Sequence, residues 1–280
     1  MTVSYLASGG FKILGVGRDA KTRKGEKVGF LTGILYMAPE RKISRLVTGW
    51  LANPETAPLW LDEYLQGVEA RVWQKANLCP QASKGCAAAC LDTAGHGGFS
   101  PSVPVGRARK TLLWLAHRSQ FAELLRADVA KLQRNAERRG LKAQVRLNGT
   151  TDIRWERYPA IRKIMDDFPQ VDFYDYTKFS LSARRNLPAN YKLTYSLSEK
   201  TNSWKQAERY LQAGRPVAVV FKSAADAKTV ISQGSWRGYD TVDGDEHDAR
   251  FYDGGVITAL KPKGKARSGA GGAFLQSAAG

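Results

Sequence analysis

Short apolar runs alternate with amphipathic segments through the second half of the chain. Apolar, aromatic and β-branched residues gather at 143–147, 171–176, 191–196, 215–222 and 239–242, and the segments between them carry apolar residues at helical spacing. Strands that alternate with helices indicate a parallel sheet with right-handed crossovers. Together with a strand before the cysteines, the pattern predicts an α/β fold, a partial TIM-like (βα)6 barrel with a small N-terminal extension.

The first half of the chain is less regular. An apolar run over residues 28–38, ended by Pro39, reads as a strand, and a helix capped near residues 53–56 and a strand-like RVW at 71–73 follow it. Apolar residues at helical spacing over residues 105–139, with Gly140 as the stop, predict a two-part helical connection.

These elements divide the chain into three parts. Residues 1–70 form a strand and helix extension packed on the barrel, residues 71–262 form the barrel with its cysteine loop, and residues 263–280 form a basic, Gly- and Ala-rich flexible tail. No apolar run reaches the ~20 residues of a membrane span, and no charged-then-apolar leader is present. We expect a soluble cytoplasmic protein with no membrane partner.

The cysteines are the most informative residues of the chain. All three, Cys79, Cys86 and Cys90, fall in one C-x6-C-x3-C stretch that His96 follows closely. Thiolates are the usual ligands of iron–sulfur clusters, and four of them close the site. Three thiolates leave one iron open to a substrate or cofactor, so we predict a cluster, of the 4Fe-4S type, with these cysteines as its ligands.

Three other interpretations of the cysteines stay open. A structural zinc site could take His96 as its fourth ligand, although the paired C-x2-C knuckles of such sites are absent. A disulfide with one thiol left over suits a small secreted chain. Buried cysteines without chemistry are common, but Pro80 and Gly85 indicate a loop, and loops rarely bury three thiols.

Polar side chains follow each predicted strand. Because the carboxyl ends of parallel strands meet at one edge of the sheet, these side chains predict a ligand site on that edge, with the cysteine loop as one wall. The predicted cofactor contacts are Asn148, Thr150, Asp152, Asp175, Lys178, Ser196, Asp243 and Asp245.

The last of these strand ends is the densest acidic cluster of the chain. Asp243, Asp245 and Asp248 stand there with Glu246 and His247. Carboxylate oxygens suit Mg²⁺ or Mn²⁺, and two carboxylates can organise phosphoryl transfer or hydrolysis. No side chain is assigned as catalytic from the sequence, and whether the protein is an enzyme stays open.

Charge adds a second class of partner. The chain carries 43 Lys and Arg against 26 Asp and Glu, a formal net charge of +17. Such an excess favours nucleic acid or another polyanion through phosphate neutralisation. The basic residues are nevertheless spread along the whole chain, so a solvated basic surface explains the charge equally well.

Several motifs occur in the order of a known family. They are NLCPQASKGCAAACLDTAG, RLNGTTDIRWE, FYDYTK, NYKLTYSLSE, VDGDEHDARFYD and LKPKGKAR, spread over residues 75–267. In these the chain resembles the phage and prophage gene-product-88-like proteins, which have no settled activity. The resemblance implies a phage protein acting in the cytoplasm of its host.

A weaker resemblance is to the radical S-adenosylmethionine enzymes. It is carried by the three-cysteine loop after a first strand, the partial (βα)6 count and RLNGTTDI, while the cysteine spacing departs from their C-x3-C-x2-C. It implies S-adenosylmethionine as a candidate cofactor. We thus expect a phage-type iron–sulfur protein with a small-molecule ligand at an open iron, the alternative being a basic nucleic-acid-binding protein with a structural zinc or iron–sulfur site.

Overall fold

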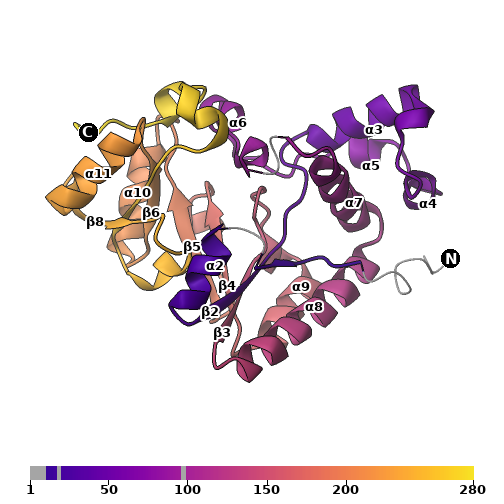
Figure 1. Ribbon diagram of the computed structural model, residues 1–280, viewed down its shortest axis with the longest axis horizontal. Coiled ribbons are helices and arrows are strands. Elements are labelled where there is room, and N and C mark those ends of the chain that lie inside the picture. The colour runs from indigo at the N-terminus through magenta and orange to yellow at the C-terminus, as the bar shows by residue number, and fades with distance from the viewer. Residues whose placement is uncertain (1–10, 18–19, 96–98) are drawn as a thin grey trace.

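One sheet runs through the middle of the molecule (Figure 1). The computed structural model describes residues 11–17, 20–95 and 99–280. Within these ranges nine strands pair in the order β1-β2-β3-β4-β5-β6-β9-β8-β7. The strands are β1 (Gly15–Val16), β2 (Phe30–Ile34), β3 (Lys142–Arg146), β4 (Asp172–Thr177), β5 (Tyr191–Ser196), β6 (Val217–Val220), β7 (Ser235–Trp236), β8 (Tyr239–Asp243) and β9 (Ile257–Leu260).

The sheet is parallel except at its two edges. Strands β2 to β6 pair with their neighbours in chain order, and β9 and β8 continue the parallel run. Strands β1 and β7 pair antiparallel at the edges. The predicted mixed α/β class is therefore confirmed.

Helices connect the parallel strands and cover one face of the sheet. Helix α8 packs on β2 and β3, α10 on β5 and β6, and α11 on β8 and β9, while α3, α4, α5 and α7 gather in a separate group beside the sheet (Figure 1). The helices are α2 (Ala20–Lys27), α3 (Lys42–Ala52), α4 (Leu61–Leu65), α5 (Arg71–Gln74), α6 (Lys84–Ala88), α7 (Ser102–Ala116), α8 (Arg118–Arg138), α9 (Pro159–Asp167), α10 (Ser203–Gln212) and α11 (Ala224–Gln233). The 3-10 turns are η1 (Pro54–Thr56), η2 (Leu91–Thr93), η4 (Trp155–Arg157), η5 (Leu181–Ala183), η6 (Ala249–Tyr252), η7 (Gly264–Ser268) and η8 (Gly272–Phe274).

Helix α8 shows how the sequence pattern becomes packing. Phe121, Leu125, Val129 and Leu132 recur at helical spacing and are all buried in the main core. The helix ends before Gly140, whose φ of 62° is a left-handed conformation that glycine adopts without steric cost. The two-part helical connection is thus confirmed as α7 and α8.

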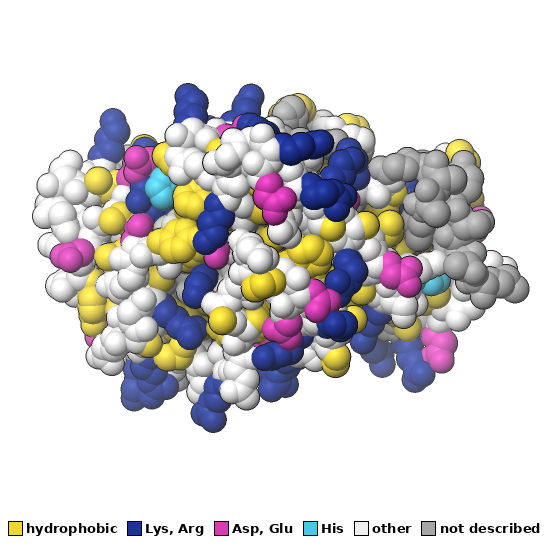
Figure 2. Space-filling model, turned by 90° about the horizontal axis from the view of Figure 1, so that it is seen from below, with side chains coloured by type: hydrophobic (Ala, Val, Ile, Leu, Met, Phe, Trp, Pro, Cys, Tyr) yellow, Lys and Arg dark blue, Asp and Glu magenta, His cyan; other side chains and the backbone are white. Residues whose placement is uncertain are grey.

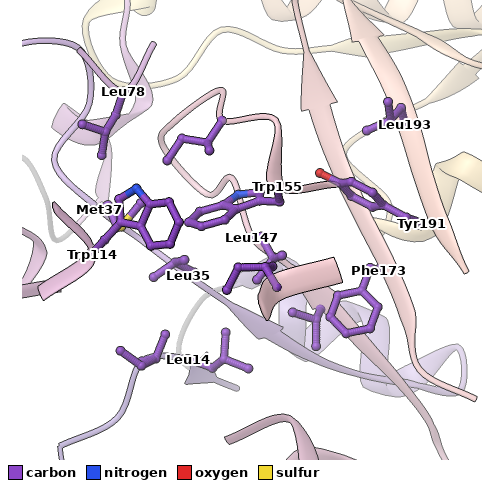
Figure 3. Close-up of a cluster of buried hydrophobic side chains, with 14 of the residues drawn as sticks. Leu14, Leu35, Met37, Leu78, Trp114, Leu147, Trp155, Phe173, Tyr191 and Leu193 are labelled. Carbon is purple, nitrogen blue, oxygen red and sulfur yellow. The ribbon is translucent and has the colours of Figure 1, made fainter. Parts of the chain in front are cut away.

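Aromatic side chains fill the core between the helices and the sheet. Trp114 of α7 and Trp155 of η4 lie side by side, with ring centroids 4.8 Å apart (Figure 3). Leu147, just after β3, and Phe173, near the start of β4, belong to the same cluster. An edge-on aromatic pair stabilises a fold by about 0.5–1.5 kcal/mol beyond its area burial.

Around β3, β4 and β5 the opposite face of the sheet carries polar and aromatic side chains. Because side chains alternate along a strand, Phe173 joins the main core while its neighbour Tyr174 packs with Ala249 and Phe251 of η6 on the other side. We call this second face, with Arg146, Tyr174, Tyr176, Thr194 and Ser196, the polar face. Arg146 and Ser196 lie at the carboxyl ends of their strands, at one end of this face.

Three details of the sequence prediction were wrong. RVW at 71–73 is part of helix α5 rather than a strand, since only Trp73 of it is buried. Residues 54–56 form the turn η1, and the next helix begins at Leu61. The prediction also missed β9, a four-residue strand that is inserted between β6 and β8.

The C-terminal segment crosses the carboxyl ends of the strands next to α6 (Figure 1). Gln276 bridges to Phe221 after β6, and the side chains of Phe274 and Leu275 are buried. A small cluster joins these two residues to Ala89 and Cys86 of the cysteine loop. The segment for which the sequence predicts a flexible tail thus packs here on the cysteine loop.

No helix in the described ranges is both long and apolar enough to cross a membrane.

Candidate functional site

The cysteine loop lies at the carboxyl-end edge of the sheet. Cys79 follows α5, Cys86 lies in α6, and Cys90 immediately precedes η2. The Sγ of Cys79 is 3.5 Å from the backbone oxygen of Thr150, in the loop after β3. The backbone N–H of Asp152 donates to the oxygen of Leu78 at 2.9 Å, which ties the two loops together.

All three cysteines are free and partly buried. Burial, together with the nearby charges of Asp92 and Cys86, raises the pKa of the Cys90 thiol to about 12. Burial also raises the pKa of Cys79 far above its ordinary value, with smaller contributions from Cys90 and Cys86. The charges of Cys86 and Cys90 thus act on the pKa of Cys79, and the charge of Cys86 acts on that of Cys90.

In residues 11–17, 20–95 and 99–280, no three His, Cys, Asp or Glu side chains are placed to hold a metal ion. His96 lies outside the described residues.

Two predicted contacts, Asn148 and Asp175, meet at the ends of β3 and β4. The Asn148 N–H donates to Asp175 Oδ1 at 2.5 Å, and its Nδ2 donates to Asp175 Oδ2 at 3.1 Å. Asn148 Oδ1 accepts from Thr151, from the N–H of Ile153 and from Trp155 Nε1. Both side chains are buried, and these bonds fix the course of the NGTTD loop that holds Thr150 against Cys79.

Asp152 joins the same loop to the next strand end. Its carboxylate accepts from Thr177 Oγ1 at 2.8 Å and from the N–H of Lys178 at 2.9 Å. Arg184 Nη1 donates to Thr177 Oγ1 at 3.0 Å and lies 3.9 Å from Asp152 Oδ1. Asp152 thus connects the loop that contacts Cys79 with a buried arginine behind it.

Lys178 and Ser196 lie together at the polar face of the sheet. Lys178 Nζ donates to Ser196 Oγ at 2.6 Å and lies 5.1 Å from the centre of the Phe274 ring. Phe274 in turn packs with Cys86. The ammonium group of Lys178 therefore stands near the cysteine loop, where it can attract an anionic ligand.

Asp243 and Asp245 belong to a separate polar cluster after β8. Lys263 Nζ pairs with Asp245 Oδ1 at 2.7 Å, and Lys261 Nζ lies 3.7 Å from Asp243 Oδ2. The Asp245 N–H donates to Asp243 Oδ1 at 2.7 Å. These aspartates hold the chain that leaves β9, and the structure pairs them with lysines.

Glu199, just after β5, is a site residue that the sequence prediction did not single out. Its carboxylate accepts from Ser83 Oγ and from the N–H of Gly85, both at 2.6 Å. Ser83 Oγ also accepts from the Cys86 N–H, at 3.2 Å, as the cap of α6. Glu199 therefore fixes the turn that carries Cys86. Its position at a strand end was visible in the sequence, but its partners lie more than a hundred residues earlier.

Asp175 gives the molecule a predicted pH dependence. Burial raises its pKa to about 7, against the hydrogen bonds from Tyr191 and Asn148 and the charge of Arg184. Its ordinary pKa is 3.8, so between these values the folded state binds a proton that the unfolded state has lost. The stability contributed by this proton is complete below pH ~4 and is lost as the pH rises through ~7.

We expect Asp175→Asn to remove this dependence. At about 1.4 kcal/mol per pH unit, the stability of the wild type should fall by ~2–3 kcal/mol relative to the variant between pH 5 and pH 8. Urea unfolding of both proteins at pH 5, 6, 7 and 8 measures this difference. If the free energies of unfolding of the two proteins changed with pH in parallel, Asp175 would have its ordinary pKa.

The model of the family described as gene product 88 matches residues 38–274, which include the cysteine loop and all the strands from β3 to β9. Neither a curated protein nor a solved structure matches the chain.

Proposed function

This chain belongs to the gene product 88 family, and we propose that it is an iron–sulfur protein whose cluster is held by Cys79, Cys86 and Cys90. The observation that carries the proposal is the state of the three thiols: all are free and partly buried, and all lie in one loop at the carboxyl-end edge of the sheet. A cluster bound through them would supply redox or Lewis-acid chemistry at the iron without a protein thiolate.

The strand order supports a site of this kind. Strands β2 to β6 are parallel and adjacent in chain order, and β9 continues the parallel run beside β6. This parallel run supports a barrel-like arrangement of the strands as part of our proposal. In such a fold the carboxyl ends of the strands surround one site, and the cysteine loop follows the first of them. We propose that the open iron faces the end of the polar face that lies at the carboxyl ends of the strands. A small molecule, with S-adenosylmethionine as a candidate, would bind there.

The protein's own residues would position the cluster and its ligand. Glu199 holds the turn of Cys86, and the backbone oxygen of Thr150 contacts Cys79. Lys178 would attract an anionic part of the ligand. Asn148, Asp152 and Asp175 act behind them as supports of the loop, because their hydrogen bonds run to other protein groups.

Anaerobic purification tests the proposal directly. The protein should be brown, contain iron and acid-labile sulfide, and show an electron paramagnetic resonance signal after reduction. Cys86→Ser should lose most of the iron, whereas Ser182→Ala at an exposed position of η5 should keep it. Colourless wild-type protein that binds neither iron nor sulfide after anaerobic reconstitution would rule the cluster out.

Nucleic-acid binding is the second candidate, favoured by the net charge of +17. On the face shown in Figure 2, Lys and Arg side chains are spread over the surface among polar and apolar groups. Such a surface predicts weak binding without sequence preference, and a steep loss of affinity with salt. We expect the affinity for a duplex of mixed sequence to fall by ~10-fold or more between 50 and 200 mM salt. Undetectable binding at low salt would remove this candidate.

A further inference from the structure

An open hollow lies between η5 and the end of α10. Its volume of about 530 Å³ falls within the range of about 300–1,000 Å³ that is usual for small-ligand sites. The residues that line it are Leu181, Ser182, Arg185, Arg209, Gln212 and Ala213. Two of these six residues are arginines and none is acidic, so the hollow concentrates positive charge. None of them belongs to the cysteine loop.

The backbone that carries Arg185 is fixed by the residue before it. Arg184 is buried and donates to Glu156 Oε2 and to Tyr191 Oη, both at 3.0 Å. Arg185 is exposed and lines the hollow. The inward-facing arginine thus holds the chain in place where the next arginine meets solvent.

The helix that carries Arg209 is joined to the same loop. Tyr210, the next residue of α10, is buried, and its Oη donates to the backbone oxygen of Phe179 at 3.1 Å. Arg209 itself is exposed. Because both walls of the hollow rest on buried hydrogen bonds, a ligand that binds there need not order the backbone around it.

Neither arginine of the hollow has a counter-charge in the protein. In the part of the chain that the structure describes, no carboxylate forms an ion pair with Arg185 or with Arg209. Elsewhere on the surface such pairs do form, as between Arg139 and Glu26, whose Nη2 and Oε2 atoms are 2.7 Å apart. Two positive charges that line one hollow without an acidic partner attract an anion.

We propose that this hollow binds a phosphate group through Arg185 and Arg209. Each guanidinium offers planar, paired donors that match the oxygens of a phosphate, and the two charges together balance a dianion. The amide of Gln212 adds a neutral donor, while Leu181 and Ala213 leave apolar surface for the organic part of a ligand. A nucleic-acid strand as the source of the phosphate rests on the second candidate function; the phosphate site itself rests on neither candidate.

Two probes test the proposal on the full-length protein. Inorganic phosphate is titrated by calorimetry, against chloride at equal ionic strength, and a fluorescent oligo-dT strand is titrated by anisotropy at low salt. Arg185→Gln combined with Arg209→Gln should weaken at least one of the two probes by ~10-fold or more. A loss confined to inorganic phosphate identifies a small phosphorylated molecule as the ligand, whereas a loss of strand binding identifies a nucleic acid.

A second double variant controls for charge. Lys205→Gln combined with Lys228→Gln removes two positive charges from exposed positions of α10 and α11 that do not line the hollow. It should weaken either probe by less than ~3-fold. If neither probe distinguishes the two double variants, or if the wild type binds neither probe, the proposal is overturned. Iron content does not enter these measurements, so their outcome is separate from that of the cluster.

Discussion

Replacement of Arg184 by methionine should lower the free energy of unfolding by about 3–5 kcal/mol, because it leaves buried carboxylates without their counter-charge. The Arg184 side chain is fully buried. Its Nε lies 2.8 Å from Glu156 Oε1, and its Nη2 donates to Glu156 Oε2 at 3.0 Å. Methionine keeps much of the volume, so the lost charge and hydrogen bonds dominate the effect.

The neighbouring arginine is a matched control. Arg185 is exposed, so Arg185→Gln should change stability by less than about 0.5 kcal/mol. Urea unfolding of both variants gives the comparison. The double variant Arg184→Met with Glu156→Gln should recover part of the loss, since it removes the unpaired charge. A single Arg184→Met variant as stable as Arg185→Gln would show that the charge is not needed.

The parallel sheet was predictable because each strand is a short apolar run between helical segments. Phe173 and Val217 lie in such runs, and both are buried where the pattern places them. The insertion of β9 between β6 and β8 could not be derived, since strand order in a sheet depends on tertiary packing and not on local periodicity. The four-residue strand itself also gives too short a pattern to stand out from its loops.

For the candidate site, the positions of the strand-end residues were predictable, but their hydrogen-bond partners were not. Side chains at the ends of neighbouring parallel strands must meet, and Asn148 and Asp175 do. The sequence did not show that their bonds are directed into the protein, because that depends on Arg184 and Tyr191, which arrive from other elements.

The sharpest test of the cysteine loop is Gly85→Ala. A Cβ on Gly85 would lie 2.3 Å from the Gly271 oxygen, 2.6 Å from Phe274 Cβ and 2.9 Å from Glu199 Oε1. Alanine favours a helix over glycine by about 1 kcal/mol, but two of these contacts are too close for any relaxation by side-chain rotation alone. We therefore expect the C-terminal segment to separate from α6, and the variant to lose about 1–3 kcal/mol of stability.

Gly49→Ala separates this effect from helix propensity. Gly49 lies inside α3, and a Cβ there meets nothing within 4 Å, so alanine should stabilise the protein by up to ~1 kcal/mol.

Hydrogen exchange over residues 264–276 should accelerate in Gly85→Ala alone, with or without a cluster. Iron content after anaerobic reconstitution should fall in the same variant, because Cys86 moves with Gly85. Faster exchange with an unchanged iron content would mean that the C-terminal segment stabilises the fold but does not position Cys86. In that case the hydrogen bonds of Glu199 and Ser83 would be enough to hold Cys86 in place.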